Sequence, residues 1–176
     1  MSDFREEVAR RDDAVDTATR AAAANRDRIQ KAVADFLTAM QRLGGKGART
    51  VPIIEMRRRP GGAEGGLWNR RTRTQNHYTS VEVGHLTGWA LASAQVSPGT
   101  YPFNPNTAVV DDGRLLTVER DDPGVYGAST YTWDNVPSLS ADEVKRYIWD
   151  VRKLGTADAD LVMACLVETY RICRGS

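Results

Sequence analysis

The pattern of hydrophobic and polar positions divides the chain into three parts. Residues 3 to 43 repeat apolar side chains every three and four positions, which predicts one long amphipathic helix ending at Gly44-Gly45. From Thr50 to Trp133 the period shifts toward two and turn residues recur, which predicts an antiparallel sheet. The remaining residues return to helical spacing. We therefore expect one α+β domain with about five to seven strands, and with two C-terminal helices packed on one face.

The boundaries of these parts follow from their turn residues. We expect an N-terminal amphipathic helix in residues 1–45, an antiparallel sheet in residues 46–137 and a helical pair in residues 138–176. A chain of 176 residues suits a single globular domain, so these are layers of one fold rather than separate domains.

The long helix carries a seven-residue apolar register that weakens toward the N-terminus. A straight helix of this length would measure about 60 Å, which exceeds the diameter of a compact domain of this size. Part of it must therefore protrude or bend back, and the small residues of segment 19–28 predict where. One interpretation is an arm for self-association or partner docking; the other is a frayed or bent helix packed on its own domain. The predicted self-association residues are Phe4, Val8, Val15, Ala22 and Ile29.

Two local motifs predict details of the sheet and of the C-terminal helices. Asp112-Gly113 between β-rich runs predicts a hairpin with a two-residue type I′ turn. Ser140 and Glu143 have the spacing of a capping box, and the helix that they open is expected to end at Gly155. A second helix is expected from about Thr156, apolar around most of its circumference and hence packed between the sheet and another helix.

Charge is balanced overall but concentrated in one segment. The net charge is +1, yet residues 42 to 73 hold nine basic residues against two acidic ones, a local balance of +7. Pairing Arg49–Arg59 with Leu67–Thr74 as a hairpin would place Glu55 opposite Arg71 and Arg58 opposite Trp68. The residues predicted to bind a partner or nucleic acid are Arg57, Arg58, Arg59, Trp68, Arg70, Arg71 and Arg73.

Three uses of this basic hairpin compete. It is an ordinary solvated strand face, a surface that docks an acidic partner protein, or an arm in residues 49–74 that binds nucleic acid through phosphate contacts. Domains that bind nucleic acid usually carry a clear net basic excess, which this chain lacks. We therefore favour a solvated face or a protein contact, with nucleic-acid binding as the alternative.

Candidate catalytic groups are sparse. His77 and His85 lie in no metal-ligand or nucleophile spacing, and Cys165 and Cys173 are expected to be buried apolar groups too far apart for a disulfide. The acidic turns Asp111-Asp112 and Asp121-Asp122 match ordinary turn preferences better than a cation site. We expect a non-catalytic interaction or assembly module without a cofactor or metal.

The expected partner is another protein or a second copy of the chain, with nucleic acid as the alternative. No apolar run is long enough to span a bilayer, and the first residues lack the layout of a signal peptide. We therefore expect a cytoplasmic protein without a membrane partner.

Overall fold

The protein is an α+β fold in which a long helix lies across one end of a sheet. The computed structural model describes residues 2–58, 78–92, 106–118, 120–121 and 130–175. Predicted residues outside these ranges, among them Arg59, Trp68 and His77, have no described position. In chain order the elements are α1 (Ser2–Arg42), β1 (Arg49–Arg58), β2 (Tyr78–Ala90), β3 (Thr107–Val110), β4 (Leu115–Thr117), β5 (Arg120–Asp121), β6 (Thr130–Tyr131), β7 (Leu139–Ser140), α2 (Ala141–Tyr147), α3 (Val151–Thr156) and α4 (Ala159–Gly175).

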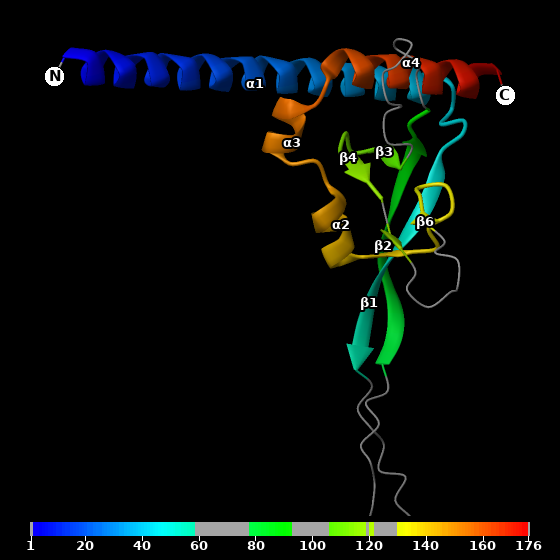
Figure 1. Cartoon of the computed structure of the whole chain (residues 1–176). Coiled ribbons are helices and arrows are strands. Elements are labelled where there is room, and N and C mark those ends of the chain that lie inside the picture. Colours follow the sequence, from blue (N-terminus) through cyan, green and yellow to red (C-terminus); the bar gives the residue numbers. More distant parts are fainter. Residues whose placement is uncertain (1, 59–77, 93–105, 119, 122–129, 176) are drawn as a thin grey trace, which may run out of the picture.

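The main sheet has five strands in the order β4-β3-β2-β1-β7, and β5 pairs with β6 separately. Neighbouring strands are antiparallel except for β1 and β7, where Ile53 pairs with Leu139 in parallel. The expected antiparallel sheet is therefore mixed at one edge. β1 and β2 also extend beyond their neighbours as a two-stranded ribbon that points away from α1 (Figure 1).

The β3–β4 hairpin forms as expected, but its turn differs from the prediction. The backbone N–H of Val110 bonds to the carbonyl of Arg114 at 2.9 Å, which leaves a three-residue loop between them. Within this loop only Gly113 has a positive φ, of 88°, so Asp112 is not in the conformation that a type I′ turn requires. A tight turn followed by a glycine in the left-handed region matches the right-handed twist of the strands equally well.

Both faces of the sheet carry a hydrophobic core, because side chains alternate along each strand. On β3, Val109 faces the core formed with α1 and α4, while Ala108 and Val110 face the core that contains Trp133 and Val144 of α2. The expectation of all helices on one face is therefore wrong for α2. Gly88 permits close contact inside the sheet, since a Cβ there would lie 2.3 Å from the carbonyl oxygen of Val109.

The C-terminal part contains three described helices instead of the expected two. Ser140 and Glu143 form the predicted capping box, with Ser140 N to Glu143 Oε2 at 2.8 Å and Glu143 N to Ser140 Oγ at 3.2 Å. The helix then stops at Tyr147, because Ile148 bridges to Leu116 of β4. Asp150 opens α3 by accepting the N–H of Lys153 at 2.8 Å.

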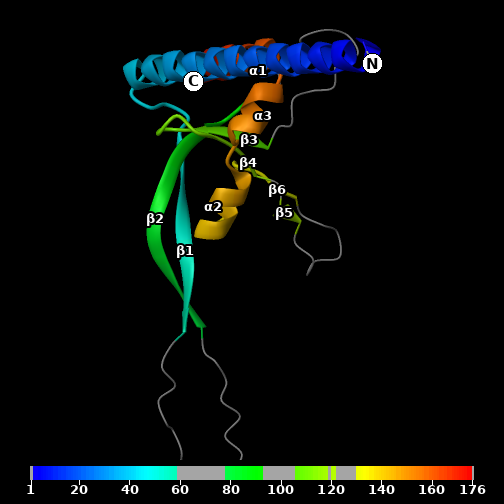
Figure 2. The same ribbon diagram turned by 90° about the vertical axis from the view of Figure 1, so that its left-hand side faces the viewer.

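The shape of the molecule is set by α1, which is a single straight rod in both views (Figures 1 and 2). Its C-terminal end is closed as expected, with Gly44 and Gly45 at φ of 68° and 72° and the Gly45 N–H bonded to the Met40 carbonyl at 3.0 Å. α4 lies alongside only the C-terminal half of α1, so the N-terminal half extends past the sheet (Figure 1).

Candidate interaction surfaces

The N-terminal half of α1 is solvent-exposed along almost its whole length. From Phe4 to Ala21, here called the arm, Glu7 alone is half-buried and no side chain is buried. The side chains of Phe4, Val8 and Val15 are 75%, 41% and 63% exposed, respectively. The arm therefore protrudes, as one of the two interpretations of the sequence expected, and none of the described residues covers its apolar side chains.

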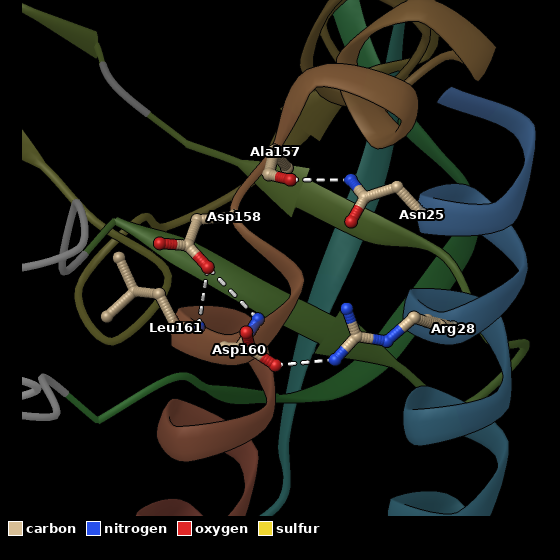
Figure 3. Close-up of polar contacts among 6 residues, drawn as sticks. All are labelled: Asn25, Arg28, Ala157, Asp158, Asp160 and Leu161. Atoms are coloured by element: carbon tan, nitrogen blue, oxygen red, sulfur yellow. Dashed lines mark hydrogen bonds and ion pairs between the residues drawn. The ribbon is translucent and has the colours of Figure 1, made fainter. Parts of the chain in front are cut away.

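The base of the arm lies where α1 contacts the end of α3. A Cβ on Gly155 would lie 3.1 Å from the Cβ of Ala22, so the two helices approach as closely as small residues allow. One turn further, the Asn25 amide nitrogen donates to the carbonyls of Leu154 and Gly155 at 3.2 Å. It also donates to the carbonyl of Ala157 at 2.6 Å (Figure 3). These contacts anchor α1 and determine where the arm starts.

The start of α4 adds charged contacts to the same anchor. Arg28 donates to a carboxylate oxygen of Asp160 at 2.5 Å, and Asp158 accepts the backbone N–H groups of Asp160 and Leu161 at 3.0 and 3.1 Å (Figure 3). A carboxylate that accepts the first N–H groups of a helix satisfies donors that have no partner within that helix. The junction between α3 and α4 is therefore held against α1 by backbone and side-chain bonds together.

Two of the predicted self-association residues belong to the protein's own packing. Ile29 is 1% exposed and packs in the core with Val33 and Phe36. Ala22 is half-buried against Gly155. Neither side chain is available to a second copy, because the same apolar face that is exposed in the arm is covered by α3 and the core from Ala22 onward. Of the predicted self-association residues, Phe4, Val8 and Val15 are therefore the ones that are exposed.

Charges on the arm are mixed and lie at its surface. Glu7 pairs with Arg10, and it accepts a bond from the Arg11 Nε at 3.0 Å. Such pairs three and four residues apart stabilise an exposed helix by a few tenths of a kcal/mol each. A helix of this length in isolation would be only marginally stable. Because the arm continues a packed helix, its nucleation cost is already met.

The basic hairpin has a different register from the one predicted. Arg58 lies opposite Tyr78 and Glu55 opposite Val81, so the expected pairs with Trp68 and Arg71 are wrong. A register shift between Ile53 and Ile54 marks a bulge within the ribbon. The predicted residues Arg59, Trp68, Arg70, Arg71 and Arg73 lie outside the described ranges.

The described part of the ribbon is not strongly basic. Arg57 and Arg58 are exposed, but Arg57 donates to Glu55 at 3.3 Å, and Glu82 lies opposite Ile54 on β2. Arg49 at the base has a structural role, since its guanidinium donates to the carbonyls of Trp133 and Val136, the latter at 2.6 Å. Arg57 and Arg58 are therefore the predicted contact residues that the structure places at a surface.

The candidate catalytic groups do not assemble into a site within the described ranges. His85 is exposed on β2, and no cluster of three or more potential metal ligands occurs among the described side chains. Both cysteines are buried and free, as expected, and burial raises the pKa of the Cys173 thiol. Asp112 interacts with Arg114, whose Nε lies 2.6 Å from the Asp112 carboxylate.

Sequence reasoning missed an apolar groove between α1 and α4. Its lining includes Phe36, Met163, Leu166 and Val167, and it encloses about 290 Å³. Met163 and Val167 are exposed, although the apolar pattern around most of α4 predicted a helix packed between the sheet and another helix. The spacing of these two residues, four apart on the same helix, is the signal that marks a second apolar stripe.

No helix among the described residues has both the length and the apolar character needed to cross a membrane. Searches against protein-family models, curated proteins and solved structures find no match for this chain.

Proposed function

We propose that this protein is a non-catalytic assembly module that self-associates or docks a protein partner through the arm. The observation that carries the proposal is the exposure of Phe4, Val8 and Val15 along a straight helical extension. A protruding helix costs conformational entropy to order, and the described part of the chain buries none of the arm's apolar side chains in return. Packing against a second apolar helix face would supply that burial. We further propose a cytoplasmic location, as the sequence led us to expect.

Sedimentation velocity over a concentration series tests this function. We would compare the wild-type chain with the triple variant F4Q/V8Q/V15Q, since glutamine supports a helix at least as well as phenylalanine or valine. The matched control is M163Q/V167Q, which removes exposed apolar side chains from α4 instead. The proposal expects concentration-dependent association that the arm variant abolishes and the α4 variant retains. A wild-type chain that stays monomeric at every concentration, and shows no arm-dependent capture of another protein, would refute it.

Nucleic-acid binding by residues 49–74 remains the alternative proposal, and the balanced charge of the described ribbon does not favour it. If arginines there neutralise phosphates, the affinity would fall with salt at a logarithmic slope of roughly −0.9 per phosphate on duplex DNA. Gel-shift titrations at two salt concentrations, with the variant R57Q/R58Q beside the wild type, measure this. Retention of DNA or RNA that falls steeply with salt and weakens in the variant would favour the alternative.

A further inference from the structure

We propose that the arm binds the arm of a second copy in antiparallel orientation, with Phe4 of each copy packed against Val15 of the other. This inference rests on the proposed self-association and specifies its partner, orientation and register. It follows from three features of the described residues: the seam along the arm, the position of α3, and the distribution of charge.

The seam provides matching layers in the antiparallel orientation. Phe4, Val8, Arg11 and Val15 follow the alternating three- and four-residue spacing that places side chains on one face of a helix. In an antiparallel pair the two kinds of seam position oppose each other. Phe4 then meets Val15 and Val8 meets Arg11, and the two-fold axis repeats both layers.

The position of α3 limits how far the arms can overlap. A shift to the next longer register would place Phe4 of one copy against Ala22 of the other. That surface is occupied, because Ala22 packs against Gly155 and Asn25 binds the carbonyl of Ala157 at 2.6 Å. The next shorter register would lose Val15 from the interface. The register that pairs Phe4 with Val15 therefore buries the most apolar surface without displacing α3.

Charge complementarity selects the antiparallel orientation over the parallel one. In the antiparallel register Arg5 flanks the seam beside Asp12 of the other copy, and symmetry makes this attractive pair twice. In a parallel, in-register pair Glu7 would instead lie beside Asp12 of the other copy, and Arg11 would face its own counterpart across the seam. Like charges at such positions destabilise a helix pair and thereby exclude the wrong orientation.

Arg11 is compatible with its seam position in the antiparallel pair. Its guanidinium is held by Glu7 at 3.0 Å on the same helix, at the edge of the apolar face. The aliphatic part of the arginine side chain can then cover Val8 of the other copy while the charged end stays in water. The intrahelical ion pair therefore leaves the layer hydrophobic where the two arms touch.

The resulting assembly is closed and weak. Each arm uses its seam once in an isologous contact, so two copies complete a dimer and no filament grows. An overlap from Phe4 to Val15 is about 18 Å long and buries on the order of 400 Å² in total, well under a standard stable interface. We therefore expect a weak, transient dimer that is populated only at high protein concentration.

Cysteine cross-linking under mild oxidation reads the orientation directly. We expect a mixture of the F4C and V15C variants to form a disulfide-linked dimer, whereas F4C alone and V15C alone form little. The wild-type chain is the control, since Cys165 and Cys173 are both buried. Cross-linking by F4C alone and V15C alone would show a parallel pair and overturn the inference. Cross-linking of F4C with V167C would place the arm in the groove of α1 and α4, and would also overturn it.

A charge reversal gives an independent readout in the reduced protein. D12R places like charges beside Arg5 twice in the antiparallel dimer, and we expect it to raise the dissociation constant on the order of tenfold. The double variant R5E/D12R restores both pairs and should recover most of the loss. In a parallel pair D12R would instead relieve the repulsion with Glu7 and tighten association, which would contradict the inference.

The outcomes separate this inference from the proposed function. If the wild type associates through the arm but D12R tightens the dimer, or the mixed cysteine variants fail to cross-link, the orientation is wrong and the assembly role stands. If sedimentation detects no association of the wild type at millimolar concentration, the second copy is not the partner and this inference fails. Docking of a different protein through the arm would then remain for the proposed function.

Discussion

Substituting Asn25 tests how α1 is anchored where the arm leaves the fold. Its side-chain N–H groups are shared among the carbonyls of Leu154, Gly155 and Ala157 at the end of α3, at 3.2, 3.2 and 2.6 Å. The last carbonyls of a helix have no partner within it, so the amide satisfies groups that would otherwise face a partly buried contact. Alanine removes both donors, and aspartate replaces them with a carboxylate of nearly the same shape.

The expected loss follows from the number of bonds removed. A net hydrogen bond contributes about 1 kcal/mol, and a carbonyl left without a partner adds to the cost. We expect N25A to lower the free energy of unfolding by about 2–3 kcal/mol. We expect N25D to lower the free energy of unfolding by about 1 kcal/mol more than N25A at pH 7. Its negative carboxylate would face three carbonyl oxygens in a half-buried position.

The aspartate variant should also depend on pH, with a definite sign. Burial and the facing carbonyls disfavour the charged carboxylate, so the pKa of the new carboxyl in the folded chain rises above its unfolded value of about 3.9. The folded state then binds more protons than the unfolded state between these two pKa values. Stability relative to wild type therefore falls as the pH rises through this window.

Urea denaturation monitored by circular dichroism measures both effects. Wild type, N25A and N25D would be compared at pH 7 and near pH 4, and R28A serves as a neighbouring control that removes an exposed ion pair to Asp160. Variants that both unfold within about 0.5 kcal/mol of wild type would refute the anchoring role, because the loss of even one net bond exceeds that figure. An N25D penalty that is equal at the two pH values would refute the carbonyl environment.

Three further predictions concern other contacts. Gly155→Ala should lower the melting temperature, because its new Cβ would lie 3.1 Å from the Cβ of Ala22, and this crowding should outweigh the higher helix propensity of alanine. In a double-mutant cycle, A22G should relieve this loss of stability. Burial raises the pKa of the Asp112 carboxyl and the bonds and charge of Arg114 lower it by more, so it lies below its ordinary value. D112N should therefore cost less than about 1 kcal/mol at pH 7 in urea melts. The difference should shrink as the pH falls through the lowered pKa of this carboxyl, because wild type then becomes protonated too, and a difference that does not shrink in acid would contradict this origin. Arg11→Leu should strengthen self-association in sedimentation by making the seam continuous, and unchanged association would mean that the partner does not cover Arg11.

Much of the fold was predictable because local signals agreed with tertiary packing. The α+β class, the long helix ending at Gly44-Gly45 and the capping box at Ser140 and Glu143 are confirmed. Each depends on backbone geometry or hydrogen bonds within a few residues. The excess length and weak N-terminal seam of α1 likewise predicted that burial weakens toward the N-terminus, with an exposed arm as one of two interpretations.

The errors occur where long-range packing decides between similar local patterns. The predicted hairpin register offered attractive pairs for Glu55 and Arg58, but the observed register instead brings Val51 opposite Leu86 in a buried core. Charge pairs on an exposed ribbon contribute less than core burial, so the core determines the register. The apolar stripe after Ser140 also predicted a helix that continues through Ile148. In the structure Ile148 instead bridges to Leu116 of the sheet, and this contact interrupts the helix.

The candidate site was predictable in part for the same reason. Sequence spacing placed Phe4, Val8 and Val15 on one seam, but it also included Ile29, which is buried in the core. A helix pattern reports which side chains share a face and does not report where along that face the rest of the chain lies. The position of α3 on Ala22 supplies that limit.

Hydrogen exchange at low and high protein concentration tests the assembly role of the arm most directly. Exposed helical amides without tertiary cover open and exchange readily, and a bound partner slows their exchange. Mass spectrometry would follow the exchange of peptides from the arm, from the groove face of α4 and from the β1–β2 ribbon. The account predicts that protection rises with concentration in residues 4–21 and stays constant in α4 and in the described part of the ribbon. Exchange in the arm that is independent of concentration, together with new protection elsewhere, would contradict it.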